Sequence, residues 1–530
     1  MRVESEKRDE LLTPGVKWWK RIFEKIKETK HLPTAAFATL GCKVNQYETQ
    51  RILDDFEERG FAITEFNQVA DIYVINTCSV TQAAERKSQY MIRKVAKQNP
   101  DAIVVMTGCY GEMAKIKNET VDEVTLVVPN HRKLETLPIV MSAYPQLNER
   151  LLADSLPYAT VAPRHRTRAT IKVQDGCNVF CSFCSIPFTR KYMKSRPIAE
   201  LVAEAERKAE QGYKEIVITG VLVGAYGQDN FIPILGTEAP RFTRDSVPPD
   251  FDLSACLLRL AQVPGIERVR LSSIEPTQVT DRLLEAFASE PKLCRHMHIP
   301  LQSGDDGVLA AMNRPYDQEF YLERCRTAKE RIPDLAITSD IMTGFPGEDE
   351  AAFENTLKVV REVGFARAHL FRYSPRPNTP AADFDNQVPE KVKEERAKRL
   401  GDACRETQKR FIESYLGREL EVLVEGKEGG AKEGAEEGAS GNDAHERLNA
   451  TPAEKTGRGS LLSGYTGNYI RVQFTGGSHL CGTIAKVRLI EPTASGAIGE
   501  SDGAHFGPME APPDADFIPL TSFQGAFQGA

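Results

Sequence analysis

Short apolar runs alternate with longer charged segments of helical pattern through the first 150 residues. The strand-like runs cover 35–40, 72–76 and 103–107, and helix-like segments at 46–59 and 82–97 lie between them. Strands that alternate with helices are typical of an open, mostly parallel sheet. Ligands of such sheets bind beyond the carboxyl ends of the strands, so we expect chemistry at that edge.

A second alternating series begins near residue 170 and predicts six βα units, which would form an incomplete (β/α) barrel. Polar and glycine-rich sequences follow each strand, as they do at the catalytic end of complete barrels. We therefore expect six loops to surround one mouth. The strands are predicted at 170–174, 215–219, 268–272, 296–300, 336–341 and 368–372.

The C-terminal third changes to the alternation of apolar and polar residues that is typical of half-buried strands. Runs at 420–424, 464–474 and 483–489, with Gly and Asn at the turns, predict a small antiparallel β-barrel. The segment 426–460 is rich in Gly, Ala and Glu and is expected to be disordered. The residues 491–530 are acidic, lack Lys and Arg, and are read as a mobile tail.

These patterns predict an α/β protein that combines an open parallel sheet, a partial (β/α)6 barrel and a small antiparallel β-barrel. A stretch at 232–251 follows neither period and is read as a surface insertion. The expected parts are an N-terminal extension with one apolar helix face at 1–33, the α/β domain at 34–150, the partial barrel at 160–395, the small barrel at 415–490 with its insertion, and the tail at 491–530.

Composition and charge exclude several classes of protein. The chain has 530 residues, too many for one ordinary domain, and its 41% hydrophobic and 27% charged residues exclude general disorder. Its 68 Lys and Arg against 75 Asp and Glu give a net charge of −7, so any nucleic-acid site must be a local basic patch. No apolar run approaches the ~20 residues of a membrane span, and no secretory signal is present. We expect a cytoplasmic protein with no membrane association.

The strongest chemical signal is CxxxCxxC in the loop after the first barrel strand, formed by Cys177, Cys181 and Cys184, here called the loop trio. Eleven cysteines are too few for a disulfide scaffold, and their uneven spacing favours metal or cluster binding. Three thiolates can hold three irons of a 4Fe-4S cluster and leave the fourth iron open. A zinc site is the alternative, but it normally takes four ligands, and His165 is the only nearby candidate for the fourth.

Three more cysteines stand one after each of the N-terminal strands. Cys42, Cys78 and Cys109, here called the strand-end trio, are expected at one sheet edge. Such an arrangement suits a three-cysteine metal site. Three buried structural cysteines are the alternative, since free Cys is among the most buried residue types.

CxxxCxxC in the first loop of a partial barrel resembles the radical S-adenosylmethionine enzymes. Within them, several longer motifs are similar to the methylthiotransferases, and the resemblance runs from about residue 35 to residue 489. The motifs are TLGCKVNQYET at 39–49, NTCSVT at 76–81, TGCY at 107–110, DGCNVFCSFCSIP at 175–187, SSIEP at 272–276, HIPLQSG at 298–304 and GFPGE at 344–348. Among these, TLGCKVNQYET and SSIEP look like the branch that acts on threonylcarbamoyladenosine at tRNA position 37.

The resemblance implies two 4Fe-4S clusters, one on the loop trio and a second on the strand-end trio. In the family's scheme, one S-adenosylmethionine methylates a sulfur held on the second cluster. Another is cleaved at the first cluster to a 5'-deoxyadenosyl radical, which removes hydrogen from a C–H bond, and the carbon takes the methylthio group. A reducing electron donor of the flavodoxin or ferredoxin kind is implied, and the source of sulfur stays open.

Polar residues of the other loops are candidates for binding S-adenosylmethionine. Thr219 and Gly220 follow the second barrel strand, where a small residue lets the backbone approach the methionine moiety. For each candidate, a loop polar group that is satisfied within the protein is the alternative. The candidates for its carboxylate and ribose are Ser273, Glu275, Gln302 and Ser303.

Basic and aromatic residues around the loop trio indicate an RNA substrate, because phosphates need cations and an extruded base needs an aromatic partner. A solvated charged face is the alternative. The C-terminal barrel is similar to the RNA-binding TRAM domain through LVEG at 423–426 and GYTGNYIRV at 464–472. The basic residues are Arg164, Arg166, Arg168, Arg190, Lys191, Lys194 and Arg196, and the aromatic residues are Phe180, Phe183, Phe188 and Tyr192.

The sequence therefore predicts a tRNA methylthiotransferase that modifies carbon 2 of threonylcarbamoyladenosine. Two alternatives lie within the family, namely modification of isopentenyladenosine in tRNA and of an aspartate in a small-subunit ribosomal protein. A third alternative is a non-catalytic RNA-binding or electron-transfer iron–sulfur protein.

Overall fold

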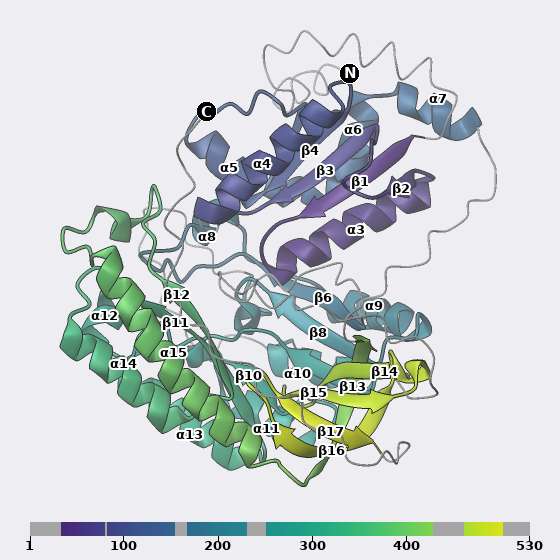
Figure 1. The fold of residues 1–530 in the computed structure, drawn as a ribbon. Coiled ribbons are helices and arrows are strands. Elements are labelled where there is room, and N and C mark those ends of the chain that lie inside the picture. The colour runs from purple at the N-terminus through teal and green to yellow at the C-terminus, as the bar shows by residue number, and fades with distance from the viewer. Residues whose placement is uncertain (1–32, 80–81, 154–166, 230–250, 428–459, 502–530) are drawn as a thin grey trace, which may run out of the picture.

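The computed structural model describes residues 33–79, 82–153, 167–229, 251–427 and 460–501. Within these residues an N-terminal sheet lies over one end of a partial barrel, and a closed β-barrel lies at the other end (Figure 1). The expectations for the N-terminal helix and the surface insertion fall outside the described residues, as do those for most of the 426–460 segment and of the tail.

The N-terminal part is a five-stranded parallel sheet in the order β2-β1-β3-β4-β5. Its elements are β1 Thr34–Thr39, α3 Lys43–Arg59, β2 Ala62–Thr64, β3 Ile72–Thr77, α4 Gln82–Gln98, β4 Ile103–Gly108, α5 Cys109–Ile116, β5 Leu126–Val128, η1 Asn130–Glu135, α6 Thr136–Ala143 and α7 Gln146–Ala153. Every residue of β3 and β4 is buried because α3, α6 and α7 cover one face of the sheet and α4 and α5 cover the other. Burial on both faces explains why these strands are continuous apolar runs in the sequence.

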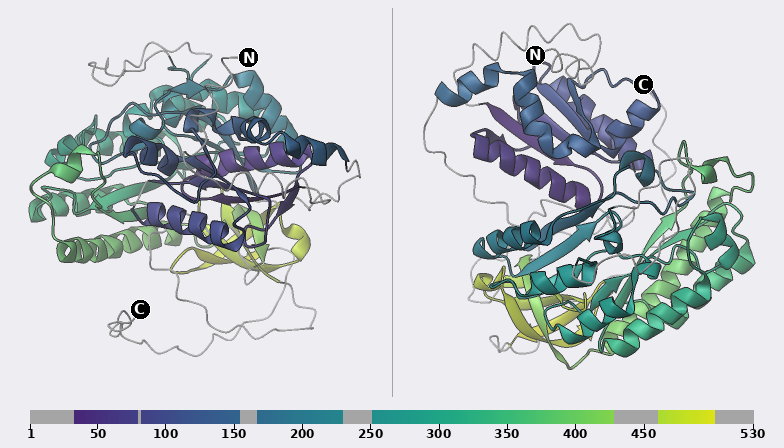
Figure 2. Two further views of the ribbon diagram at one scale, coloured as in Figure 1. Left: turned by 90° about the horizontal axis from the view of Figure 1, so that it is seen from above. Right: turned by 180° about the vertical axis from the view of Figure 1, so that it is seen from behind.

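Six parallel strands form the partial barrel, whose helices make its outer layer (Figure 2). The strands are β6 Arg168–Asp175, β8 Glu215–Gly220, β9 Arg268–Leu271, β10 His296–His298, β11 Ala336–Thr343 and β12 Arg367–Arg372, with β7 Lys194–Ser195 as an antiparallel edge. The main helices are α8 Ile186–Thr189, α9 Ile198–Glu210, α10 Leu253–Ala261, α11 Asp281–Ser289, α12 Asp306–Ala311, α13 Gln318–Arg331, α14 Glu350–Val363 and α15 Glu390–Glu413. Two isolated bridges, one of them between Ser273 and His298, join the β6-β8-β9 ladder to the β10-β11-β12 ladder.

The strand predictions for these two parts are confirmed, with ends that differ by no more than two residues from those observed. The strands β2, β5 and β7 were not predicted, because two or three residues are too few to show a period. The described part of the chain contains no helix with the length and apolarity needed to cross a membrane.

The C-terminal strands close into a barrel in the order β13-β14-β15-β17-β16. They are β13 Glu419–Lys427, β14 Ser460–Thr466, β15 Arg471–Gly476, β16 Ile484–Pro492 and β17 Ala497–Ser501. The predicted small β-barrel is confirmed. Four of its five strand pairs are antiparallel, and β15 and β17 run parallel. The predicted boundary at residue 490 is wrong, because β17 completes the barrel. Its inward residues are Ala497 and Gly499, which are too small to give an apolar signal in the sequence.

Buried charged and aromatic residues join the closed barrel to the amino ends of the partial-barrel strands. Arg270 donates to the carboxylate of Glu215, with Nε 2.7 Å from Oε1, and to two backbone carbonyls at the β14–β15 turn. The ring of Tyr469 stacks on His296 with 4.4 Å between the ring centroids. Glu215 and His296 begin their strands, so the closed barrel covers the end of the partial barrel that is opposite to the loop trio.

Candidate active site

The strand-end trio lies at one sheet edge, as predicted. Cys42, Cys78 and Cys109 follow β1, β3 and β4, which are neighbours in the sheet. Cys78 and Cys109 are buried and Cys42 is exposed. The side chain of Asn130 reaches the trio, with Nδ2 3.9 Å from Sγ of Cys109. The parallel sheet thus gathers three thiols that are far apart in the sequence.

Two glycines allow the ends of these strands to converge. Gly41 and Gly108 each precede a cysteine and have φ of +97° and +102°. A Cβ on Gly41 would lie 2.7 Å from Sγ of Cys78, and one on Gly108 would overlap the backbone of Thr77. Only glycine combines the positive φ with this close approach, so the Gly-Cys pairs place the thiols together.

The loop trio lies between β6 and α8, at the carboxyl end of the first barrel strand. Its three cysteines are half-buried. Arg314 donates from Nη1 to Sγ of Cys181 at 3.1 Å and also forms an ion pair with Glu275. A neighbouring cation favours the thiolate form of cysteine, which is the form that binds metal. The sequence analysis missed Arg314, because an isolated arginine far from the motif gives no spacing signal.

Burial raises the pKa of four of these thiols above the usual value of a cysteine as long as no metal binds them. Burial raises the pKa of Cys181 to about 11 despite Arg314, and it raises the pKa of Cys177 well above its usual value. Desolvation by the surrounding protein also raises the pKa of Cys184 and of Cys42, even though Cys42 is exposed at the surface. Binding of a metal or cluster to the thiolates therefore displaces protons.

The donor sets fit two 4Fe-4S clusters better than two zinc ions. Zinc holds its sulfur ligands ~2.3 Å from a single atom, whereas a 4Fe-4S cluster takes each thiolate on a different iron. In the described residues no three Cys, His, Asp or Glu side chains converge tightly enough to hold one ion. Next to Cys78 and Cys184, the hydroxyls of Ser79 and Ser185 are buried without hydrogen-bond partners, as polar groups beside a missing ligand would be. His165, the candidate fourth zinc ligand, lies outside the described residues.

The two trios lie on edges that face each other. Helix α5, which begins at Cys109, packs against α8, which follows Cys184. Arg376 lies between the trios, where burial lowers the pKa of its guanidinium against the opposing effect of the Cys184 and Cys78 thiols. Its Nε has no hydrogen-bond partner.

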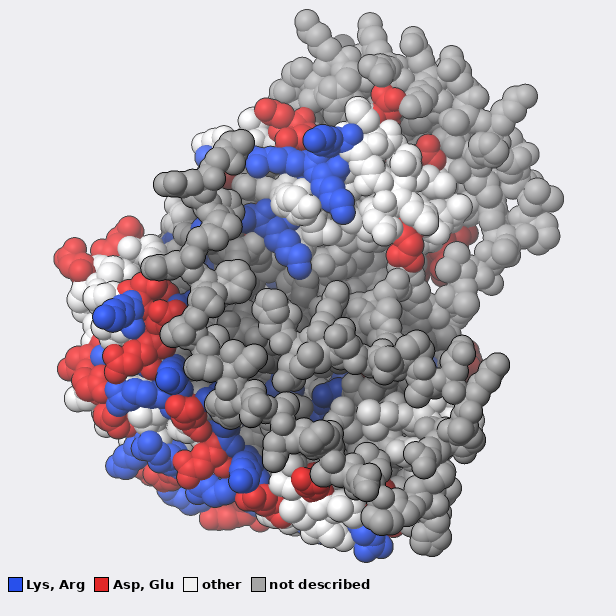
Figure 3. Space-filling view, in the orientation of Figure 1, with Lys and Arg blue, Asp and Glu red and all other residues white. Residues whose placement is uncertain are grey.

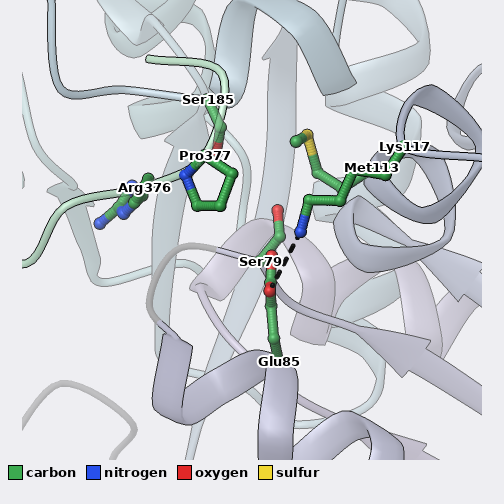
Figure 4. A pocket seen from close by; sticks show the side chains of 7 residues that line it. All are labelled: Ser79, Glu85, Met113, Lys117, Ser185, Arg376 and Pro377. Carbon is green, nitrogen blue, oxygen red and sulfur yellow. Dashed lines mark ion pairs between the residues drawn. The ribbon is translucent and has the colours of Figure 1, made fainter. Parts of the chain in front are cut away.

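A cavity of about 10 Å³ lies beside Arg376. Ser79 and Ser185 line it, together with the ion pair between Lys117 and Glu85, whose charged atoms are 3.6 Å apart. In Figure 4 the guanidinium of Arg376 points away from that ion pair, and Pro377 lies between them. The cavity is large enough for one water-sized molecule at most.

A buried cluster of five charged side chains connects the elements that carry the two trios. Glu48 lies on α3, the helix that follows the first cysteine of the strand-end trio, and Asp175 ends β6 just before the loop trio. The carboxylate of Glu48 accepts hydrogen bonds from Lys133 at 2.7 Å, from Lys172 at 2.6 Å and from both Nη atoms of Arg190 at 2.9 and 2.8 Å. Asp175 accepts from Lys172 at 2.5 Å and from Arg190 at 2.8 Å.

The cations of this cluster hold its two carboxylates in their ionised forms. Burial opposes the ionisation of Glu48, yet Arg190, Lys133 and Lys172 hold its pKa well below the usual range. Arg190 and Lys172 likewise lower the pKa of Asp175 against the effect of burial. Arg190 of this cluster also favours the thiolate of Cys42, since it lowers the pKa of that thiol against the larger effect of burial.

The predicted basic rim around the loop trio is therefore only partly exposed. Arg190 is buried in the charged cluster, so its prediction as a phosphate ligand is wrong, because two carboxylates from distant segments pair with it. Arg168 and Arg196 also form ion pairs within the protein, at 2.8 and 2.7 Å. Lys191 and Lys194 are exposed, as is Tyr192. The remaining members, Arg164 and Arg166, lie outside the described residues.

The residues predicted to bind S-adenosylmethionine surround the mouth but differ in access. Thr219 and Ser303 are buried, and the hydroxyl of Ser303 accepts from the backbone of Asp305 at 3.3 Å. Gly220 packs against Gln174, and a Cβ on Gly220 would lie only 3.2 Å from the Cβ of Gln174. In the remaining set Glu275 pairs with Arg314, Ser273 is exposed, and Gln302 is half-buried with φ of +62°.

We expect Glu48→Gln to destabilise the metal-free protein by about 3–5 kcal/mol at pH 7, because it leaves three buried cations with one carboxylate. The folded pKa of Glu48 lies below its ordinary value, so its contribution is complete at pH values above that ordinary value. It is lost as the pH falls through the lowered pKa. Chemical denaturation at pH 7, followed by far-ultraviolet circular dichroism, measures the loss.

Glu354→Gln is the matched control. Glu354 pairs with Arg399 on the surface, with half of its side chain exposed, and such a pair contributes at most about 1 kcal/mol. Equal destabilisation by the two substitutions would contradict the role given to the buried cluster.

Comparison with known proteins gives matches over both trios. The model of the Radical SAM superfamily matches residues 171–360, and that of Uncharacterized protein family UPF0004 matches residues 34–128. The threonylcarbamoyladenosine tRNA methylthiotransferase MtaB of Bacillus subtilis is 36% identical over 468 residues, which are 87% of this chain and 94% of that protein. MtaB of Aquifex aeolicus is 34% identical over 73% of this chain and 92% of its own. The tRNA-2-methylthio-N(6)-dimethylallyladenosine synthase of Alkaliphilus oremlandii is 32% identical over 89% and 92%.

Proposed function

Because this chain belongs to the radical S-adenosylmethionine methylthiotransferase family, we propose that it transfers a methylthio group to carbon 2 of threonylcarbamoyladenosine at position 37 of tRNA. The observation that carries the proposal is the pair of facing cysteine trios, each with three thiols that follow the carboxyl ends of parallel strands. When bound, two 4Fe-4S clusters and S-adenosylmethionine supply the radical and the methylated sulfur. In this proposal the loop trio holds one cluster and the strand-end trio the other.

The protein's own part is to bind, orient and shield these groups. Arg314 contacts Cys181, and the charged cluster around Glu48 fixes β6 against α3, so the two cluster sites keep one mutual geometry. Ser273 and Gln302, which reach the mouth, are the candidates for direct contact with S-adenosylmethionine. The other candidates would support the same site without direct contact. These are Thr219, Gly220, Glu275 and Ser303. A flavodoxin- or ferredoxin-like donor and a cytoplasmic location fit chemistry that needs tRNA and a strong reductant.

A second candidate is methylthiolation of isopentenyladenosine, since a dimethylallyladenosine synthase is 32% identical over most of this chain. The two substrates differ in charge, because the threonyl group carries a carboxylate and the isopentenyl group is apolar. Modification of a ribosomal protein and a non-catalytic role are less favoured, because the relatives named above are tRNA-modifying enzymes.

Mass spectrometry of tRNA nucleosides tests the proposal. A strain that lacks the protein should contain threonylcarbamoyladenosine without its methylthio derivative, and the gene returned on a plasmid should restore the derivative. Loss of the methylthio form of isopentenyladenosine instead would assign the second candidate. Unchanged nucleosides in both classes would refute a tRNA substrate.

A further inference from the structure

Helix α4 carries an excess of positive charge that is unusual in this acidic chain. Its 17 residues include five Lys and Arg and one Glu. The longer α15 has eight basic and six acidic residues in 24, and its charges are interleaved. In Figure 3 blue side chains gather over α4, whereas blue and red alternate over α13 to α15.

The basic residues of α4 form one stripe. At ~100° per residue, they fall with Tyr90 within an arc of roughly 120°, and all six are exposed. The opposite side of the helix buries Ser88, Ile92 and Val95 against the sheet. We call the stripe the basic face of α4. Its residues are Arg86, Lys87, Tyr90, Arg93, Lys94 and Lys97.

Part of this face is not neutralised within the described protein. Lys94 and Lys97 form no ion pair in the described residues, and Arg93 has one partner, the half-buried Glu123, at 3.6 Å. The only carboxylate of the helix, Glu85, is turned to Lys117. The ring of Tyr90, in the middle of the stripe, is 65% exposed.

We propose that the basic face of α4 binds the RNA backbone of the substrate beside the active site. This inference rests on the proposed function. Lysine and arginine side chains spread over ~16 Å of one helix face can contact consecutive phosphates. An exposed tyrosine among them can stack on an unpaired base. Helix α4 begins at Gln82, shortly after Cys78, so the face starts at the sheet edge that carries the strand-end trio and runs away from it.

An acidic electron-donor protein is the other macromolecule that would suit a positive surface. The placement of Tyr90 favours RNA, because a central aromatic ring adds base stacking to phosphate binding and adds nothing to a charge-only contact. The position of α4 also favours RNA. The target nucleotide must reach the space between the two trios, so the RNA on either side of it must pass along the sheet edge that carries the strand-end trio.

The test measures tRNA binding by the cluster-loaded protein under anaerobic conditions at several salt concentrations. The variant is Lys87→Glu/Lys94→Glu/Lys97→Glu, and Tyr90→Ala tests stacking separately. The control reverses three exposed lysines of α15, as Lys391→Glu/Lys398→Glu/Lys409→Glu. We expect the α4 variant to lower the slope of log affinity against log salt by about 2–3 and to weaken binding at least tenfold at 0.15 M salt. The control should keep the parent slope.

An α4 variant with the slope and affinity of the control would overturn the proposal. Normal tRNA binding with slower reduction by a flavodoxin, but not by dithionite, would also overturn it and assign the face to the electron donor. These failures differ from failure of the proposed function, in which the unaltered protein itself would bind no tRNA or modify another nucleoside. Far-ultraviolet circular dichroism confirms that each variant is folded.

Discussion

Replacement of Cys177, Cys181 and Cys184 together by alanine is expected to abolish the reductive cleavage of S-adenosylmethionine. The three thiols are the only protein ligands proposed for the cluster that binds it, so the variant keeps no site for that chemistry. Iron in anaerobically reconstituted protein should fall from about eight to about four per chain. Iron analysis and chromatographic detection of 5'-deoxyadenosine, with dithionite as reductant, measure both effects.

Cys481→Ala is the matched control for this variant. Cys481 is also a half-buried free cysteine, but it lies in the closed barrel, away from both trios. It should retain full iron and full cleavage. If the triple variant kept all its iron, or if the parent protein contained zinc, the assignment of the loop trio would be wrong.

Replacement of Cys42, Cys78 and Cys109 by alanine should separate the two halves of the reaction. Iron should again fall to about half, yet 5'-deoxyadenosine should still form, because Arg314 and the loop trio are untouched. Methylthiolated nucleoside should fall below detection, since the proposed holder of the sulfur is gone. Parallel assays of 5'-deoxyadenosine and of the modified nucleoside, from the same anaerobic reaction with purified tRNA, measure the separation.

The result that contradicts this proposal is methylthiolated product at the parent yield. Loss of both products together would also contradict it, provided that circular dichroism shows a folded protein. In that case the strand-end trio would be needed for cleavage itself, and two independent cluster sites would not describe the molecule.

The strands that carry chemistry could be predicted from the sequence because each is a short apolar run that ends in a polar or glycine-rich loop. Gly41 and Gly108 show this, since each directly precedes a cysteine and takes a positive φ at the end of its strand. Strand order could not be read directly, but the rule that ligands lie at strand carboxyl ends placed Cys42, Cys78 and Cys109 together.

The residues between the trios were beyond prediction, because their roles depend on partners far away in the chain. Glu48 meets Lys133 and Arg190, which follow it by 85 and 142 residues. Arg190 was predicted to hold an RNA phosphate because it follows the loop trio among other basic residues, whereas it pairs with Glu48 and Asp175. Pairings of this kind emerge from tertiary contacts, and no local period or spacing records them.

The closed barrel, held by the contacts of Arg270 and Tyr469, covers the end of the partial barrel where its strands begin. In the described residues, substrates therefore reach the loop trio from the side of the N-terminal sheet, where we propose that the tRNA also binds. In the family's scheme the reaction consumes two S-adenosylmethionine molecules for each nucleoside. The second molecule would then enter, and the products of the first would leave, on the same side as the bound tRNA. Exchange of S-adenosylmethionine and its products, as much as the chemical steps, would then limit the turnover rate.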